Sequence, residues 1–305
     1  MKVDANRDGQ RLDNFLLGQL KGVPKSAVYR LIRTGQVRVD GGRSKPTRKL
    51  SAGQTVRIPP VRTAGSSGPA PVSQAVLDQV RAAIVFENAD YLVVDKPAGM
   101  AVHAGSGLAW GLIDAVRRLR GDGFVELAHR IDRETSGCVV LALNGRALRH
   151  LSDAFREGRV IKRYLCLLDG RLLDPVVTLN APIGRAETGP GEGGVPKMAV
   201  IESGKRAKTR FTELERYRYC TYVEAELFTG RTHQIRVHAA HLDAPLAGDP
   251  RYGDPLALER WANRGLRRLF LHAHRLEFED EHGEGIAVSA PLPPELRAVL
   301  ARLDA

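Results

Sequence analysis

The segment AHRIDRETSG, residues 128–137, places one carboxylate, Asp132, between Arg130 and Arg133, directly before the apolar run CVVLALN. The run predicts a buried strand, so the carboxylate stands at the edge of the core. A salt-bridged surface turn is one interpretation of this pattern, and a carboxylate kept ionised for chemistry is the other. Burial raises the pKa of a carboxyl group and a neighbouring guanidinium lowers it, so a catalytic Asp132 requires an arginine partner.

Histidines gather at residues 233–241 and 272–274, which raises the question of a metal site. Zinc sites need three or four converging ligands, commonly at tight spacings. No cysteine or glutamate stands at a matching spacing, so we expect no metal. The glycine-rich segments DGG, GSG and GPGEGG lack the strand, Lys-Ser/Thr and helix context of a phosphate-binding loop, and we interpret them as turns.

The net charge of +11 over 305 residues is concentrated near the N-terminus. Residues 1–80 carry 14 Lys or Arg against 5 Asp or Glu, whereas the remaining residues carry 32 against 30. A strongly basic segment on a near-neutral body indicates a polyanionic partner. We favour nucleic acid over a merely solvated charged face.

The chain has no apolar run of the roughly 18 residues that a membrane helix needs, and its N-terminus lacks the apolar region of a secretory signal. Its three cysteines, Cys138, Cys166 and Cys220, lie far apart in apolar or alternating segments. We expect reduced core residues without a disulfide framework, which points to a cytoplasmic protein.

Two basic helices and a small hairpin are predicted for residues 1–62. Residues 11–20 place apolar side chains on one helical face, Pro24 opens a second helix, and two short strands flank an Asp-Gly-Gly turn. This small α/β module resembles the S4 RNA-binding domain from residue 11 to about residue 60. By that resemblance it would contact RNA phosphates, which give affinity and register but no sequence choice, through Arg11, Lys25, Arg30 and Arg33.

A Gly-, Ser- and Pro-rich stretch, TAGSSGPAPVSQA, marks the expected domain boundary, with residues 63–80 as a flexible linker. The body, residues 81–305, contains many short apolar strands, few helices and little regular βαβ order. This pattern predicts an α+β domain built on a mixed, mainly antiparallel sheet.

Four segments of the body carry a further resemblance: DKPAGMAVH at 95–103, HRIDRETSG at 129–137, KRYLCLLDG at 162–170 and TGRTHQIRVH at 229–238. Together they resemble the RluA-type family of pseudouridine synthases, with Ile131 where leucine is usual. The resemblance implies the pseudouridine synthase fold and the isomerisation of uridine to pseudouridine in RNA. It also implies that an Asp carboxylate acts without a cofactor, on a base flipped out of the RNA.

The resemblance assigns catalytic roles to three residues. Asp132 would be the catalytic carboxylate, and Arg231 would be its cationic partner. Tyr164 would stack on the uracil and is a candidate base for the C5 proton.

Four further residues would bind the substrate. Arg130 would fill the space that the base leaves or would bind phosphate, and Ile235 would pack beneath the base. His129 and Lys162 fall on matched motif positions and would support the site.

The S4-like module favours 23S ribosomal RNA, in a ribosome assembly intermediate, over transfer RNA, and we expect a monomer. Two other functions stay open: a non-catalytic factor that binds ribosomal RNA or assists ribosome assembly, and a glycoside hydrolase. A pure binder needs no intact Asp132, Tyr164 and Arg231. Hydrolysis uses two carboxylates that flank the bond, and apart from nearby Glu134 no second acid falls in the motifs.

Overall fold

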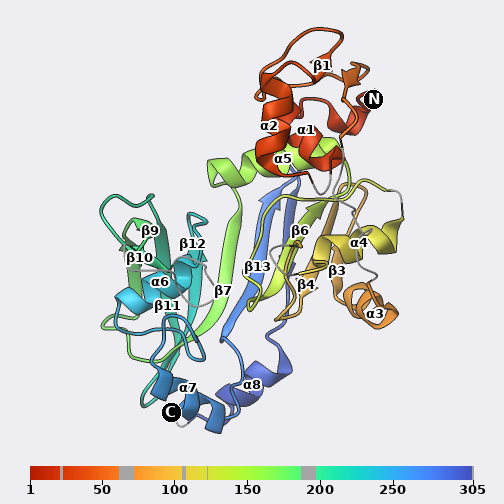
Figure 1. Cartoon of the computed structure of the whole chain (residues 1–305). Helices are drawn as coiled ribbons and strands as arrows, with labels where there is room; N and C mark the ends of the chain where they lie inside the picture. Colours follow the sequence, from red (N-terminus) through yellow and green to blue (C-terminus); the bar gives the residue numbers. More distant parts are fainter. Residues whose placement is uncertain (21–22, 62–71, 105–107, 122, 187–196, 304–305) are drawn as a thin grey trace.

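The computed structural model describes residues 1–20, 23–61, 72–104, 108–121, 123–186 and 197–303. A small N-terminal module stands on a larger body built around one sheet (Figure 1). Within the described ranges, no helix combines the length and the apolar character needed to cross a membrane.

The N-terminal module has a hydrophobic core of its own. Phe15, Val28 and Ile32 belong to a buried cluster whose members all come from residues 3–61. The predicted helices and hairpin are confirmed: the module consists of η1 Ala5–Arg7, α1 Leu12–Gln19, α2 Lys25–Arg33 and the antiparallel strands β1 Arg38–Val39 and β2 Val56–Arg57.

The body is built on a ten-stranded sheet in the order β3-β4-β6-β13-β7-β12-β11-β8, with β14 beside β13 and β5 beside β6. The pair β6–β13 is parallel, and the other pairs described in this sheet are antiparallel. The predicted α+β fold with a mixed, mainly antiparallel sheet is therefore confirmed. Its strands are β3 Ile84–Glu87, β4 Tyr91–Lys96, β5 Glu126–Leu127, β6 Ser136–Ala142, β7 Ile161–Leu168, β8 Val176–Asn180, β11 Lys208–Arg216, β12 Thr221–Leu227, β13 Leu271–Glu279 and β14 Gly285–Ser289, and a separate pair is formed by β9 Ile183–Arg185 and β10 Met198–Val200.

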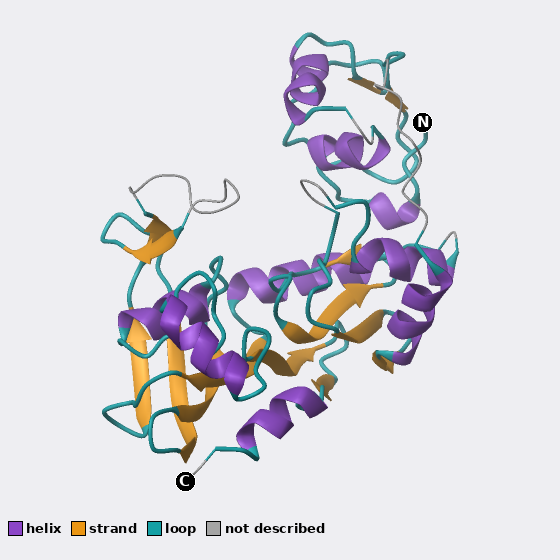
Figure 2. Ribbon diagram, turned by 60° about the horizontal axis from the view of Figure 1, so that its bottom comes forward, coloured by secondary structure: helices purple, strands orange, loops and turns teal. Residues whose placement is uncertain are grey.

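The central strands are buried on both faces, which explains their continuous apolar sequences. On β4, Leu92 and Val94 face one hydrophobic cluster, whereas Tyr91 and Val93 face another. The first cluster is covered by α3 Gln74–Ala82, α4 Leu112–Arg120 and α6 Gln234–His241, and the second by α5 Gly145–Glu157 (Figure 2). At the end of the body remote from the module lie α7 Pro255–Asn263 and α8 Pro294–Leu300 (Figure 1).

The three cysteines are buried and unpaired, as predicted for core residues: Cys138, Cys166 and Cys220. Burial raises the pKa of the Cys138 thiol to about 12 and that of Cys220 to about 11. These thiols therefore stay protonated at neutral pH and pack as small apolar side chains.

The linker predicted for residues 63–80 is wrong in its second half. Residues 74–80 lie in α3, where Val76, Leu77 and Val80 pack into the core of the body. The apolar spacing of these three residues fits one helical face, but the preceding Gly- and Pro-rich stretch obscured that signal. Residues 63–71 lie outside the described part of the chain, and the remaining domain boundaries stay predictions.

The module docks on the body where η1 meets the start of α5 (Figure 2). The backbone N of Gly145 donates to Asn6 Oδ1 at 3.2 Å, and the Arg149 guanidinium donates to the backbone oxygen of Asp8. A Cβ at position 145 would overlap the backbone carbonyl of Asn6. Only glycine therefore allows this close approach.

Gly145→Val is expected to loosen the module from α5, because overpacking a tight backbone contact costs about 1–3 kcal/mol. Limited proteolysis between module and body should become about tenfold faster or more. Gly18→Ala is the control, since a Cβ at this position in α1 makes only ordinary contact with Arg7. Equal cleavage rates for wild type and Gly145→Val would show that this contact does not hold the module.

Candidate active site

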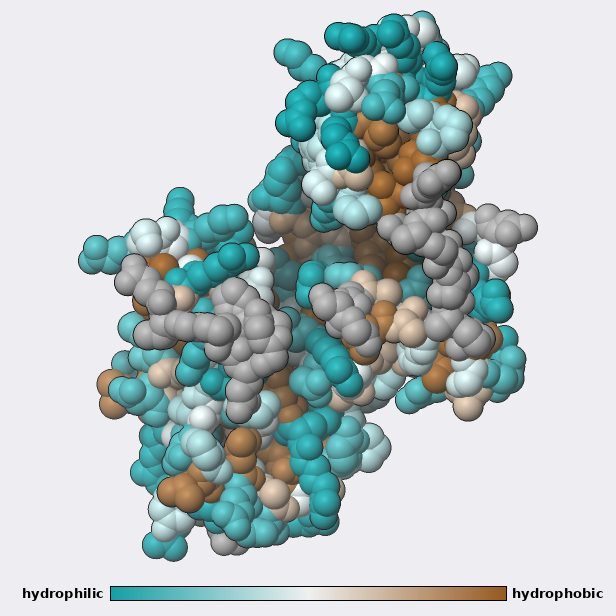
Figure 3. Space-filling view, in the orientation of Figure 1, coloured by the Kyte–Doolittle hydropathy of each residue, from teal (hydrophilic) through white to brown (hydrophobic). Residues whose placement is uncertain are grey.

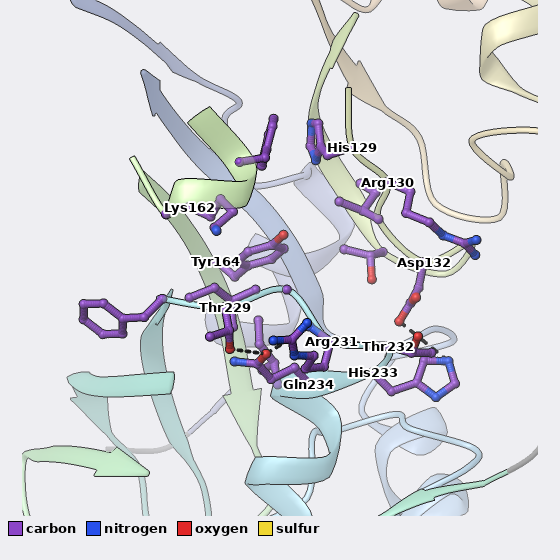
Figure 4. Close-up of a pocket in the computed structure, with 18 of the residues that line it drawn as sticks. His129, Arg130, Asp132, Lys162, Tyr164, Thr229, Arg231, Thr232, His233 and Gln234 are labelled. Carbon is purple, nitrogen blue, oxygen red and sulfur yellow. Dashed lines mark hydrogen bonds and ion pairs between the residues drawn. The ribbon is translucent and has the colours of Figure 1, made fainter. Parts of the chain in front are cut away.

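Three of the four motif segments meet around a cavity of about 710 Å³ (Figure 4). Its walls come from residues 128–135, from β7 with the end of α5, and from residues 227–236 at the end of β12 and the start of α6. The order of the strands brings these segments together. β7 lies between β12 and β13, and β13 pairs with β6, the strand that follows residues 128–135 in the chain. All seven predicted active-site residues line the cavity: His129, Arg130, Asp132, Lys162, Tyr164, Arg231 and Ile235.

The loop that carries Asp132 is fixed by the close approach of β6 and β13. Gly137 has a φ of 110°, and a side chain there would overlap the backbone of Ala273 on β13. The backbone N of Thr135 donates to the backbone oxygen of Asp132 at 3.2 Å. The glycine that ends HRIDRETSG is thus required by backbone packing.

Lys96, from the fourth motif segment, holds the same loop from the interior. Its side chain is fully buried, and its ammonium donates to three backbone oxygens, those of Pro97, Met100 and Arg133, at 2.8, 2.8 and 3.1 Å. Burial lowers the pKa of Lys96 to about 7, although nearby carboxylates including Asp132 oppose the shift. The segment DKPAGM therefore positions the loop that carries Asp132.

Asp132 faces the cavity beside two side chains of the opposite wall. Its Oδ2 lies 3.8 Å from His233 Nε2 and 3.9 Å from Arg236 Nη1, and its side chain is 25% exposed. Arg236 is buried and makes two hydrogen bonds of 2.7 Å to the buried carboxylate of Asp249. A fixed guanidinium thus stands behind Asp132 without bonding its oxygens directly, and its positive charge lies close to the carboxylate.

The prediction that Arg231 is the cationic partner of Asp132 is wrong. Arg231 is exposed, its Nε donates to the backbone oxygen of Arg206 at 2.9 Å, and no ion pair joins it to Asp132 within the described part of the chain. The reason is the start of α6 at Gln234, which puts Arg236 three residues after His233, on the same side of the turn. Sequence alone did not predict α6 and so could not choose between the two arginines.

His233 is a site residue that the sequence analysis did not assign. It adopts the left-handed conformation, with a φ of 56°, which is uncommon for a residue other than glycine. Its Nδ1 is 2.8 Å from the hydroxyl of Tyr252, which leaves Nε2 facing Asp132. Burial lowers the pKa of His233, whereas Asp132 acts in the opposite direction. This strained backbone conformation directs the His233 ring toward the Asp132 carboxylate.

Tyr164 and Ile235 form the apolar part of the cavity. They are 8% and 4% exposed and belong to the same hydrophobic cluster. Burial raises the pKa of Tyr164 well above its usual range, and the charge of Asp132 adds to the shift. The Tyr164 phenol is therefore protonated at neutral pH. In this state it can stack on a planar ligand, but it cannot accept a proton as a base.

Arg130 is exposed and points away from Tyr164, toward the outside of the cavity (Figure 4). No hydrogen bond or ion pair ties its guanidinium to another of the described residues; its charge contributes, after burial, to lowering the pKa of His103. This long cation at the mouth of the cavity is therefore available to a ligand.

The end of the cavity remote from Asp132 carries His129 and Lys162. His129 Nε2 accepts from the backbone N of Val140 at 3.0 Å, and its ring stacks on Phe155 at 4.6 Å. Burial and then the charge of Lys162 lower the pKa of His129 to about 3, so its ring is neutral. Lys162 is 7% exposed, and within the described chain its ammonium has no ion pair or hydrogen bond. The ammonium lies 5.9 Å from the centre of the Phe155 ring, and burial lowers the pKa of Lys162.

Two of the other histidines, His238 and His272, have structural partners. His238 contacts Thr209 Oγ1 at 2.8 Å and a backbone oxygen at 3.0 Å, and His272 contacts Ser136 Oγ at 2.9 Å and a backbone oxygen at 3.1 Å. Among the residues that the structure describes, no three His, Cys, Asp or Glu side chains are grouped as metal ligands.

The predicted RNA-binding residues of the module differ in their surroundings. Lys25, Arg30 and Arg33 are exposed on α2, on a module whose visible surface is largely hydrophilic (Figure 3). Arg11 instead makes hydrogen bonds of 2.5 and 3.1 Å to the buried carboxylate of Asp13. The Arg11 side chain is 46% exposed, so this pair stabilises the module while part of the side chain remains accessible.

Comparison with known proteins gives the same two-part organisation. Residues 90–241 match the family described as RNA pseudouridylate synthase, and residues 10–56 match the S4 domain. Proteins named ribosomal large subunit pseudouridine synthase C are 45% identical in Pasteurella multocida and 44% identical in Escherichia coli, each match covering 99% of this chain and 93% and 95% of the relative. The solved structure of human RNA pseudouridylate synthase domain containing 1 is 31% identical, with a TM-score of 0.60, over 73% of this chain and 87% of that one.

Lys96→Met is expected to change how the free energy of unfolding depends on pH. Between its folded pKa of about 7 and its higher unfolded value, Lys96 binds more protons in the unfolded chain, so this group stabilises the fold as pH rises. Relative to Lys96→Met, the wild type should gain on the order of 3 kcal/mol from pH 7 to pH 10, as measured by urea unfolding. In the control Lys45→Met, at an exposed position, the free energy of unfolding should depend on pH as it does in the wild type. The same pH dependence in Lys96→Met would contradict the lowered pKa of Lys96.

Proposed function

This chain belongs to the RNA pseudouridylate synthase family, and we propose that it converts uridines of 23S ribosomal RNA to pseudouridine. Identities of 45% and 44% to enzymes named for the large ribosomal subunit, over 99% of this chain, support this substrate. The observation that carries the proposal is the Asp132 carboxylate, which faces a cavity and has the guanidinium of Arg236 behind it.

The reaction requires few functional groups of the protein. The N1–C1′ bond of uridine breaks, the uracil rotates, C5 bonds to C1′, N1 gains a proton and C5 loses one. The product is an isomer of the substrate, so no electrons are exchanged and we propose that no cofactor is used. A carboxylate can add to C6, attack C1′ or remove a sugar proton, and each of these steps needs Asp132 ionised.

The target uridine must leave the RNA stack, at a cost of a few kcal/mol. We propose that the flipped uracil lies between Tyr164 and Ile235, whose buried apolar surfaces keep the detached base in place. Arg130, exposed at the mouth of the cavity, would stack in the vacated position or bind a flanking phosphate.

Lys162 supplies the cationic end of the same cavity. A buried ammonium without a counter-ion is costly, and an RNA phosphate would provide the missing charge. Neutral His129, stacked on Phe155, shapes this end without competing for the anion. We therefore assign both residues to binding of the backbone beside the flipped nucleotide.

The S4 domain would hold the surrounding RNA. Lys25, Arg30 and Arg33 project from α2 and suit non-specific phosphate contacts, with Arg11 contributing from its pair with Asp13. We propose a monomer that acts in the cytoplasm on a ribosome assembly intermediate, where large-subunit RNA is still accessible; transfer RNA is the alternative substrate.

Incubation of unmodified 23S ribosomal RNA with the protein should yield pseudouridine at defined positions, mapped by chemical modification. Asp132→Asn keeps the size of the side chain but not its charge, and should lower the rate by about 100-fold or more. Unchanged activity in this variant would contradict the proposed role. RNA binding without pseudouridine would indicate an assembly factor, and release of free uracil would indicate a hydrolase.

Removing the guanidinium behind Asp132 should lower the rate of pseudouridine formation by about tenfold or more, since the site loses a fixed positive charge beside the carboxylate. Arg236→Met is made together with Asp249→Asn, so that no buried carboxylate is left uncompensated. Arg231→Met is the matched control and should stay within about threefold of the wild-type rate. A tenfold loss caused by Arg231→Met alone would restore the original assignment of that residue.

A further inference from the structure

A second cavity, of about 540 Å³, lies at the end of the body remote from the S4 domain. It is formed by the turn between β11 and β12, the end of α7 and the residues after α8, which Figure 1 places opposite the N-terminal domain. This distal cavity shares no lining residue with the candidate active site. Its lining includes Arg218, Tyr219, Arg260, Trp261, Arg264 and Arg302.

The distal cavity is strongly basic. Four arginines line it against one carboxylate, Asp169, whose Oδ2 is 3.7 Å from Arg260. Arg218, Arg264 and Arg302 have no carboxylate within 4 Å among the described residues. Arg302 donates to the backbone oxygen of Arg264 at 3.3 Å, which anchors it at the end of α7. A guanidinium has five N–H donors, so most of them remain available to an anion.

Aromatic rings stand beside these cations. Tyr219 is 64% exposed at the turn, with the Arg218 guanidinium 5.0 Å from its ring centre, and Arg264 lies 5.7 Å from the ring of Trp261. Trp261 is 5% exposed, and its indole N–H has no acceptor within the described part of the chain. A ligand that is anionic, planar and rich in acceptors would complete these groups.

We propose that the distal cavity binds an unpaired nucleotide of the RNA substrate, with the phosphate among Arg218, Arg264 and Arg302 and the base on Tyr219. Cationic walls combined with exposed aromatic rings are the usual features of single-stranded nucleic-acid binding. An acidic peptide would match the charge but has no planar base for Tyr219. The inference takes from the proposed function only that the ligand is RNA.

The test uses Trp261 as a local reporter in the full chain. The sequence has two tryptophans, so Trp110→Phe leaves Trp261 as the only one. Titration with penta-adenylate at low salt should quench its fluorescence to saturation. Tyr219→Ala and Arg218→Gln should each weaken this binding about tenfold. Two exposed residues outside the cavity are the matched controls, and Leu256→Ala and Arg297→Gln should stay within about twofold.

Three outcomes would overturn the inference: no quenching at saturating penta-adenylate, equal effects of the cavity and control variants, or preferential binding of a penta-glutamate peptide, which would indicate a protein partner. If Trp110→Phe does not fold, hydrogen exchange of residues 217–220 with and without penta-adenylate replaces fluorescence. Neither readout uses pseudouridine formation, so failure here leaves the proposed function standing, and failure of catalysis leaves this binding measurable.

Discussion

The buried ion pair between Arg236 and Asp249 is the interaction on which the candidate active site depends. Removing two charges from water costs several kcal/mol for each ion, and only good geometry and further hydrogen bonds offset that cost. Here the pair is bidentate, and Asp249 Oδ1 also accepts from the backbone N of Arg251 and of Tyr252. Because the pair is satisfied internally, Arg236 can stand 3.9 Å from Asp132 and stabilise its charge while its oxygens stay open to a substrate.

Burial sets the charge states around that carboxylate. It keeps Tyr164 protonated and His129 and His233 neutral, so these walls of the cavity carry little charge of their own. Burial also lowers the pKa of Lys162. The cavity therefore has the carboxylate of Asp132 at one end and, at the other, the Lys162 side chain, which has no ion pair among the described residues. Such a separation suits a nucleotide whose sugar meets the carboxylate and whose backbone meets the ammonium.

Much of this arrangement was readable from the sequence, for physical reasons. Strands β4 and β6 are buried on both faces, so their continuous apolar runs predicted them. The N-terminal helices were predicted from the apolar face that packs into the core of the module. The motif segments contained the seven predicted residues, all of which line the cavity.

What the sequence did not give depends on three-dimensional placement. The motif TGRTHQIRVH holds two arginines five residues apart, and only the left-handed turn at His233 and the start of α6 decide that Arg236 faces Asp132. The partner Asp249 lies outside every motif. Likewise, the distal cavity unites a hairpin turn, α7 and the chain after α8, which no local pattern connects.

The role of Asp132 and Arg236 is tested most directly by a crystal structure of the protein bound to a 23S ribosomal RNA fragment with 5-fluorouridine at the modified position. Fluorine at C5 cannot leave as a proton, so the rearrangement should stall with the base in the site. We expect the fluorinated ring between Tyr164 and Ile235, the Asp132 carboxylate beside its sugar, and Arg236 still paired with Asp249. A target nucleotide that stays stacked in the RNA, or an Asp132 turned away from it, would show that Asp132 does not act on the base in this cavity.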